Sequence, residues 1–206
     1  MQKEIINHLL SIRSCIDQLK IELRHGWTSN GKGESVAEHS WALALLVVMC
    51  AEFIDQPVNL KKCLIMAIVH DLPESITGDS PYFLLKSASK ATEKNNAENT
   101  AMRSICSKLP SQLGQNLYDT WLEYSEGNTY EAKFVKALDK IEAQMQRNFS
   151  PLSTWISDEL TDSQSRLNKF CDFDSFLKKL RIEIQNESQR KIQKGKEPKR
   201  LPQLNA

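Results

Sequence analysis

The chain has 206 residues, of which 40% are hydrophobic and 26% are charged, and its formal net charge is +1. This length suits one domain with a substantial core, and the near-neutral charge provides no overall field that would attract nucleic acid or an anionic membrane. The longest apolar run, Trp41–Ala51, is too short to span a bilayer, and no signal peptide is expected. Five cysteines, an odd count without a CxxC pair, exclude a disulfide framework and favour a reducing, cytoplasmic compartment.

Helical periodicity of apolar residues runs through most of the chain. An opening helix carries one apolar face, a loop follows at residues 25–33, and Ser35 can cap a helix that ends near residue 54. Further helices are expected at residues 59–71, 86–107, 113–124, 129–149 and 174–192. No segment alternates with period two for long enough to predict a strand. The sequence therefore predicts an all-α, single-domain fold.

The domain is expected to cover residues 1–185 and to be followed by a basic tail, residues 186–206. Basic residues outnumber acidic ones in this tail, and such a segment can bind nucleic acid or anionic lipid. No aromatic residue is interleaved with the charges and the segment is terminal, so we predict a solvated, flexible end instead. Neither nucleic acid nor a membrane is expected as a partner.

Four polar residues lie where an apolar helix would resist them. His39 and His70 interrupt apolar helices, Asp71 follows His70 directly, and Asp139 lies within the apolar helix Phe134–Ile141. Taken singly, each histidine is typical of a core residue with a hydrogen-bond partner, and Asp139 could pair with Lys136 or Lys140. One shared divalent metal would explain all of these positions together.

Several motifs resemble those of one known family. They are RHGW at residues 24–27, ESVAEHS at 34–40, HDLPESITGD at 70–79, WLEY at 121–124 and EAKFVKALDK at 131–140. In this order and spacing, they resemble the HD-domain superfamily of helical, metal-dependent phosphohydrolases. The resemblance is greatest to the 5′-deoxynucleotidases, which hydrolyse nucleoside 5′-monophosphates, and it implies the same fold, activity and homodimeric state.

The resemblance assigns the metal ligands to His39, His70, Asp71 and Asp139. Two imidazoles and two carboxylates suit a single divalent transition metal (Mn, Co, Fe, Ni or Zn) better than magnesium. Glu74, three residues after Asp71, can accept the proton of the attacking water. Asp79 can protonate the leaving oxygen or hold the water from the other side, and the resemblance places catalytic or substrate roles on both positions.

Three further residues are predicted to bind substrate. The guanidinium of Arg24 suits a phosphate, and the resemblance puts a substrate-binding arginine there. Trp27 can stack on the base or sugar, although in bacterial members the tryptophan follows the arginine directly, whereas His25 and Gly26 intervene here. Thr77 can donate a hydrogen bond, and Lys94, Lys136 and Lys140 are weaker candidates for the phosphate.

The sequence thus predicts an enzyme that hydrolyses (deoxy)nucleoside 5′-monophosphates with a metal-activated water. One alternative is an HD-domain hydrolase of nucleoside triphosphates or alarmones, which would need more cationic residues near Arg24. A second alternative is a non-catalytic helical domain that binds nucleotides, which would not need both the ligands and the base.

Overall fold

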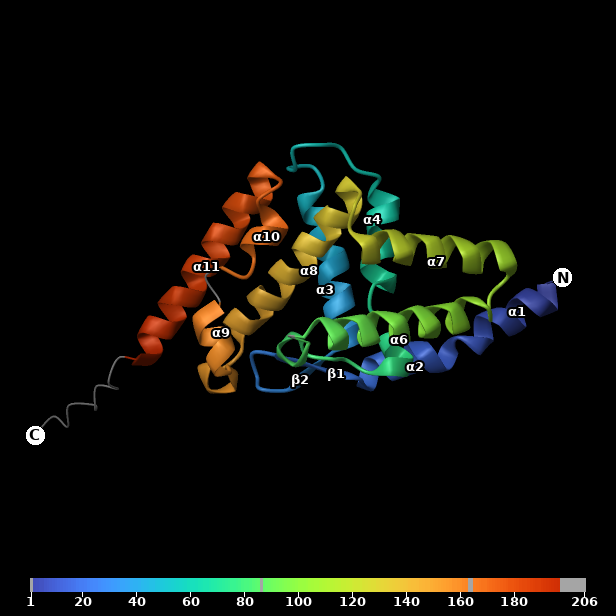
Figure 1. The fold of residues 1–206 in the computed structure, drawn as a ribbon, viewed down its shortest axis with the longest axis horizontal. Coiled ribbons are helices and arrows are strands. Elements are labelled where there is room, and N and C mark those ends of the chain that lie inside the picture. The colour runs from blue at the N-terminus through green and yellow to red at the C-terminus, as the bar shows by residue number, and fades with distance from the viewer. Residues whose placement is uncertain (1, 86, 163–164, 197–206) are drawn as a thin grey trace, which may run out of the picture.

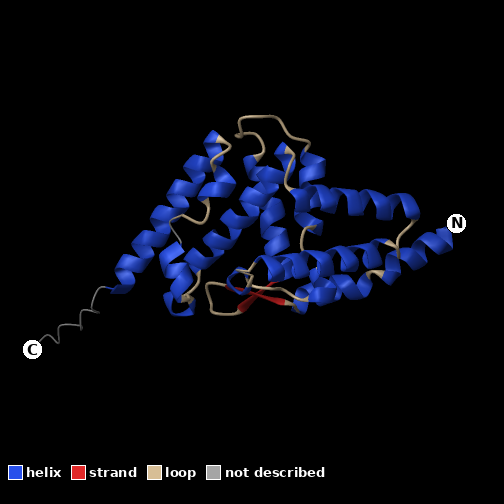
Figure 2. Cartoon of the chain, viewed as in Figure 1, coloured by secondary structure: helices blue, strands red, loops and turns tan. Residues whose placement is uncertain are grey.

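A computed structural model describes residues 2–85, 87–162 and 165–196 of the chain, and these form a helical assembly (Figures 1 and 2). The longer helices are α1 (Gln2–Ser11), α3 (Val36–Cys50), α4 (Leu60–Val69), α6 (Ala88–Cys106), α7 (Ser111–Glu126), α8 (Tyr130–Phe149) and α11 (Ser175–Lys196). Shorter helices are α2 (Arg13–Ile21), α5 (Glu74–Thr77), η1 (Tyr82–Leu84), η2 (Leu152–Thr154), α9 (Ser157–Asp162) and α10 (Asn168–Cys171). The predicted all-α fold class is confirmed.

Helix α8 is the centre of the molecule. It packs against α3, α4 and α7 on one side and against α10 and α11 on the other (Figure 1). Large side chains that are fully buried fill these contacts; among them are Leu43, Met66, Phe134, Leu138 and Leu177. Burying side chains of this size stabilises the fold by roughly 1.5–3 kcal/mol each. Residues on α3, α4 and α8 are therefore held rigidly relative to one another.

Short polar motifs determine where the helices around the core begin and end. The side chains of Asn59 and Thr129 accept hydrogen bonds from backbone N–H groups in the first turns of α4 and α8. Helix α7 ends at Gly127, whose φ of 69° lies in the left-handed region that glycine adopts without strain. These signals agree with the helix boundaries that the sequence predicts.

A small antiparallel hairpin replaces part of the predicted loop at residues 25–33, so the expectation of no strand at all is wrong. Strand β1 (Leu23–Trp27) pairs with β2 (Gly33–Ser35), with Leu23 opposite Ser35 and Trp27 opposite Gly33. Neither strand alternates between apolar and polar residues, and backbone hydrogen bonds define the pairing. The hairpin matters because β1 carries Arg24 and His25 to the wall of a cavity.

The C-terminal helix α11 runs without interruption past residue 185, where the sequence predicts the domain to end. The predicted tail, residues 186–206, therefore begins within this helix, and its residues 197–206 lie outside the described part of the chain. None of the described helices is both long and apolar enough to cross a membrane.

Candidate metal centre and adjoining cavity

His39 lies in the second turn of α3, where a capping box fixes the start of the helix. The Ser35 hydroxyl accepts a hydrogen bond from the Glu38 N–H at 3.2 Å, and the Glu38 carboxylate accepts one from the Ser35 N–H at 2.8 Å. His39 follows directly and is completely buried. The local sequence Ser-Val-Ala-Glu-His thus fixes the position of this imidazole along the helix through contacts within five residues.

His70 and Asp71 follow the last turn of α4. The Nδ1 atom of His70 donates to the Ala67 carbonyl oxygen at 2.9 Å, because a carbonyl can only accept, so the Nε2 atom carries a lone pair. The Nε2 atom lies 3.0 Å from the Asp71 carboxylate. The indole of Trp121 donates to the His70 carbonyl at 3.2 Å and holds this end of the helix.

Asp139 approaches the same point from α8. One carboxylate oxygen, Oδ1, lies 3.3 Å from Nε2 of His39. The other, Oδ2, accepts hydrogen bonds from the Tyr124 hydroxyl at 2.9 Å and lies 2.8 Å from the Lys140 ammonium. The pairing of Asp139 with Lys140 therefore does occur, but it uses one oxygen and leaves the other beside the histidines.

These residues fit a divalent metal. The ligand atoms of His39, His70 and Asp71 lie within 4.8 Å of one another. The Nε2 atoms of both histidines are buried and have no hydrogen-bond partner among the described residues. Burying two unpartnered imidazole nitrogens beside two carboxylates is costly unless a cation binds them. Two histidines with carboxylates form a donor set typical of a transition metal.

Glu142, which sequence reasoning missed, orients His39. Its carboxylate lies 2.5 Å from Nδ1 of His39, so Nδ1 donates to the carboxylate and Nε2 points to the metal position. Burial and the charge of Arg24 lower the pKa of His39, but the carboxylates of Asp139 and Glu142 outweigh them and raise the pKa to about 9. The surroundings of this imidazole therefore favour positive charge. The signal in the sequence is position: Glu142 lies one turn beyond Asp139 in the same apolar helix.

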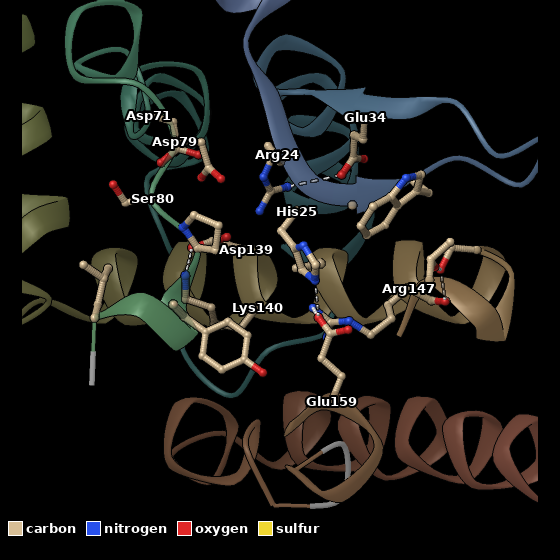
Figure 3. A pocket seen from close by; sticks show the side chains of 18 of the residues that line it. Arg24, His25, Glu34, Asp71, Asp79, Ser80, Asp139, Lys140, Arg147 and Glu159 are labelled. Carbon is tan, nitrogen blue, oxygen red and sulfur yellow. Dashed lines mark hydrogen bonds and ion pairs between the residues drawn. The ribbon is translucent and has the colours of Figure 1, made fainter. Parts of the chain in front are cut away.

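A cavity of about 260 Å³ opens beside this centre (Figure 3). Its near end is lined by Asp71, Glu74, Asp79, Lys94 and Asp139, and its far end by His25, Trp27, Tyr82, Trp155, Glu159 and Arg166. Arg24 projects from β1 toward the near end and lies 3.5 Å from Glu34 and 3.7 Å from Glu142. Burial lowers the pKa of Arg24, but the carboxylates around it, Asp71 first, raise the pKa above its usual value.

Glu74 and Asp79 both line the near end. Glu74 begins α5 and is only 3% exposed; Oε1 lies 3.1 Å from the Lys94 ammonium, while Oε2 is buried without a hydrogen-bond partner among the described residues. Burial and the neighbouring Asp71 raise the pKa of Glu74 to about 9. Asp79 follows Gly78, whose φ of 73° turns the chain back toward the cavity, and burial raises the pKa of Asp79.

The other residues predicted to bind substrate differ in whether they line the cavity. Trp27 lines the cavity, and its ring meets that of His25 edge-on at 4.9 Å. Thr77 is exposed, does not line the cavity, and donates to the backbone carbonyls of Pro73 and Gly78. Lys94 pairs with Glu74 and Glu98, whereas Lys136 donates to the Ser125 carbonyl.

The chain from the end of α8 onward contributes Arg147, Trp155, Glu159 and Arg166 to the far end, although no sequence motif marked them. The Arg147 guanidinium lies 2.8 Å from the buried Glu159 carboxylate, which is also 3.4 Å from Nε2 of His25. The Trp155 indole donates to the Arg147 carbonyl at 3.1 Å. The only sequence signal for these residues is that aromatic and charged side chains occur in a loop-rich segment. Such side chains are common on any protein surface.

The model of the family described as HD domain matches residues 16–179, which is most of the chain. The chain belongs to the HD-domain family. The predicted membership is thus confirmed, and the match extends beyond the motifs to α10 and the start of α11.

Relatives and solved structures agree with this membership. A 5′-deoxynucleotidase of Schizosaccharomyces pombe, hdd1, is 40% identical over 140 residues, which cover 64% of this chain and 67% of the relative. The 5′-deoxynucleotidase HDDC2 of Bos taurus is 32% identical over 169 residues, which cover 80% and 75%. A crystal structure from Magnetospirillum magnetotacticum, named as a predicted metal-dependent phosphohydrolase, aligns with a TM-score of 0.76 at 23% identity and covers 93% and 97%. This last likeness shows that the two chains share a fold.

Proposed function

We propose that this HD-domain chain hydrolyses (deoxy)nucleoside 5′-monophosphates to a nucleoside and inorganic phosphate. The observation that carries the proposal is the cavity, which has Asp71 and Asp139 in its wall beside the two unpartnered histidine nitrogens at one end, and aromatic rings at the other. Relatives that are 30–40% identical carry the name 5′-deoxynucleotidase, which supports the same substrate class.

His39, His70, Asp71 and Asp139 would hold one divalent transition metal. When bound, such a metal polarises a phosphoryl oxygen and lowers the pKa of a coordinated water. The donor set suits Mn, Co, Fe, Ni or Zn, because imidazole nitrogen favours transition metals over magnesium. Glu142 contributes by fixing the ring of His39, and the Ala67 carbonyl does the same for His70.

The remaining near-end residues would carry out the proton transfers and bind the phosphate. Arg24 binds phosphate oxygens through its planar fork of donors. Glu74, whose Oε2 is buried without a hydrogen-bond partner among the described residues, accepts the proton of the water that attacks phosphorus. The bond between phosphorus and the 5′ oxygen breaks, and Asp79 donates a proton to that oxygen. Burial raises the pKa of Asp79, so this carboxyl retains a proton more readily than an exposed one.

The charges around the cavity favour a monophosphate over a triphosphate. Among the described residues of the near end, Lys94 and Lys140 are already paired with carboxylates. Arg147 is paired with Glu159 at the far end. Arg24 lies further from its carboxylates, at 3.5 and 3.7 Å, and is therefore the main near-end cation for a phosphate, whereas a triphosphate or an alarmone needs several. A volume of about 260 Å³ also suits a small ligand.

We further propose that the chain forms a homodimer through the outer face of α3. Trp41, Leu45, Val48 and Met49 recur at helical spacing on this face, and Trp41 is 70% exposed. A continuous stripe of large apolar side chains is unusual on a monomer, and a second copy would bury it. Light scattering tests this: Trp41→Glu should give a monomer, whereas Ile182→Glu, an exposed apolar position on α11, should not. A monomeric wild-type chain would refute the proposal.

The proposed setting is the cytoplasm. All five cysteines are free thiols in the structure, which is typical of a reducing compartment. A nucleoside monophosphate is the proposed partner, and no role in binding nucleic acid is proposed.

A phosphate-release screen tests the function. The purified chain is loaded in turn with Mn²⁺, Co²⁺, Fe²⁺, Ni²⁺, Zn²⁺ and Mg²⁺ and mixed with nucleoside mono- and triphosphates. We expect release from monophosphates with one or more of the transition metals. Release from triphosphates alone would instead identify the other hydrolase class, and no release with any metal would favour a non-catalytic binding domain.

A further inference from the structure

The far end of the cavity combines flat rings with cationic side chains. Its residues come from three segments: β1 gives His25 and Trp27, η1 gives Tyr82, and the chain between α8 and α10 gives Trp155 and Arg166. Trp155 is almost fully buried. A planar aromatic group of the ligand can stack on such rings in many orientations.

Two groups at this end have hydrogen-bonding capacity that none of the described residues uses. The Tyr82 hydroxyl is buried without a hydrogen-bond partner among the described residues. The carbon of the Arg166 guanidinium lies 3.2 Å from the centre of the Tyr82 ring, a cation–π contact that leaves the edge of the guanidinium open. Arg147, by contrast, is engaged by Glu159 at 2.8 Å and by Gln144 at 2.9 Å.

Both groups act as hydrogen-bond donors toward a ligand. A guanidinium can only donate hydrogen bonds, and its fork matches two adjacent acceptors. Burial raises the pKa of Tyr82, so its hydroxyl keeps its proton and can also donate. A ligand placed between these groups therefore gains most when it presents acceptor oxygens and nitrogens.

We propose that the far end binds the nucleobase and that Arg166 and the Tyr82 hydroxyl donate to a carbonyl oxygen of that base. This inference rests on the proposed function, since it takes the phosphate to lie at the metal end. Guanine, cytosine, thymine and uracil all have a carbonyl group, whereas adenine has none. Arg166 thereby selects carbonyl-bearing bases over adenine.

The selection arises because an unsuitable base leaves the donors of Arg166 and Tyr82 without an acceptor. A carbonyl oxygen can accept two hydrogen bonds, and O6 of guanine, O2 of cytosine and O2 or O4 of thymine and uracil are such oxygens. Adenine presents an amino donor where these bases present an oxygen, so donor would face donor. The Tyr82 hydroxyl is buried, and a buried donor without an acceptor discriminates strongly against the wrong ligand.

The test compares kcat/KM for four deoxynucleoside monophosphates and for 2-deoxyribose 5-phosphate, which has no base. The full-length chain is used with the metal that gives the highest phosphate release. We expect Arg166→Ala to lower kcat/KM for the guanine, cytosine and thymine substrates by about 10- to 100-fold, the range for a hydrogen bond from a charged group. The values for the adenine substrate and for deoxyribose 5-phosphate should change by less than about 3-fold.

A second variant and a matched control separate recognition from folding. Tyr82→Phe keeps the ring beneath Arg166 and removes only the hydroxyl, so we expect a loss of about 3- to 10-fold for the same bases. Arg103→Ala removes a comparable cation–π pair, in which the guanidinium carbon lies 4.4 Å from the Tyr118 ring centre on α6 and α7, and should leave the base preference unchanged.

The outcomes distinguish this inference from the proposed function. Equal losses for all substrates in both variants, deoxyribose 5-phosphate included, or a wild-type chain that hydrolyses the adenine nucleotide as well as the others, would overturn the inference while leaving the activity intact. If no monophosphate is hydrolysed, the proposed function fails, and calorimetric Kd values for deoxyguanosine and deoxyadenosine monophosphate then decide the inference. A preference for guanine of 10-fold or more that Arg166→Ala removes would uphold it, and equal Kd values would overturn it.

Discussion

Glu142 touches no predicted metal ligand except His39, yet its replacement should weaken metal binding. The carboxylate lies 2.5 Å from Nδ1 of His39, and both side chains are buried. A hydrogen bond to a charged group contributes about 1.5–3 kcal/mol, more than one between neutral groups. In Glu142→Gln the amide still fits, but the charge that favours the Nδ1–H tautomer is lost.

The expected effect is a metal affinity about 10- to 100-fold weaker, because each 1.4 kcal/mol corresponds to about a factor of ten. The assay is a competition titration of Mn²⁺, Co²⁺ or Zn²⁺ against a chelator of known affinity. The matched control is Glu131→Gln on the same helix, since that carboxylate lies 3.3 Å from the Lys62 ammonium and outside the cavity. An unchanged metal affinity in Glu142→Gln, with the fold intact, would refute the orienting role.

Three further variants have expected outcomes of different kinds. Glu74→Ala should keep its metal but lose about 10²- to 10⁴-fold in kcat, the range for a general base; normal turnover would leave Glu74 a structural role only. Asp139→Ala should lose the metal without gross unfolding, which elemental analysis and circular dichroism check, and stoichiometric metal in that variant would remove Asp139 from the ligand set. Asp174→Ala should lower the free energy of unfolding by about 3 kcal/mol in a urea titration, because the buried carboxylate accepts hydrogen bonds from the Leu177 and Asp55 N–H groups and the Tyr130 hydroxyl. Asp174→Asn keeps an acceptor and should cost less, so equal losses in the two variants would contradict this account.

The sequence predicted the long helices after residue 35 well, because each of them carries its own local signal. Apolar periodicity indicated their buried faces, and Ser35, Asn59 and Thr129 marked three starts that the structure has as capped N-termini. The predicted opening helix is instead two helices, α1 and α2, and α1 buries none of its apolar side chains, while α9 and α10 were not predicted. The β1–β2 hairpin was missed for a physical reason. Its strands are short and partly exposed, and Gly31, with a φ of 84°, only makes the connecting turn possible without specifying the pairing.

The near end of the cavity could be predicted because its residues violate local preference. Charged or polar side chains such as His39 and Asp139 in apolar helices stand out, and the structure brings them together, although their roles as ligands stay a prediction. Thr77 was selected for its position in a motif, and the structure places its hydroxyl against backbone carbonyls. The far end depends on Arg147, Glu159 and Arg166, which meet β1 only through the tertiary fold. A pattern within one sequence cannot predict a tertiary contact of this kind.

Helix α8 also sets the size of ligand that the cavity can accept. Asp139 lies at one end of the cavity and Arg147 at the other, eight residues further along the same rigid helix. At about 1.5 Å per residue, they are roughly 12 Å apart along the axis, a span comparable to a nucleotide from its phosphate to the far edge of its base. The length of this helical segment therefore fixes the distance between the two ends of the cavity. Inserting one residue between Glu142 and Arg147 would turn everything beyond it by about 100° and remove Arg147 and the residues it supports from the cavity wall, while leaving the metal end unchanged.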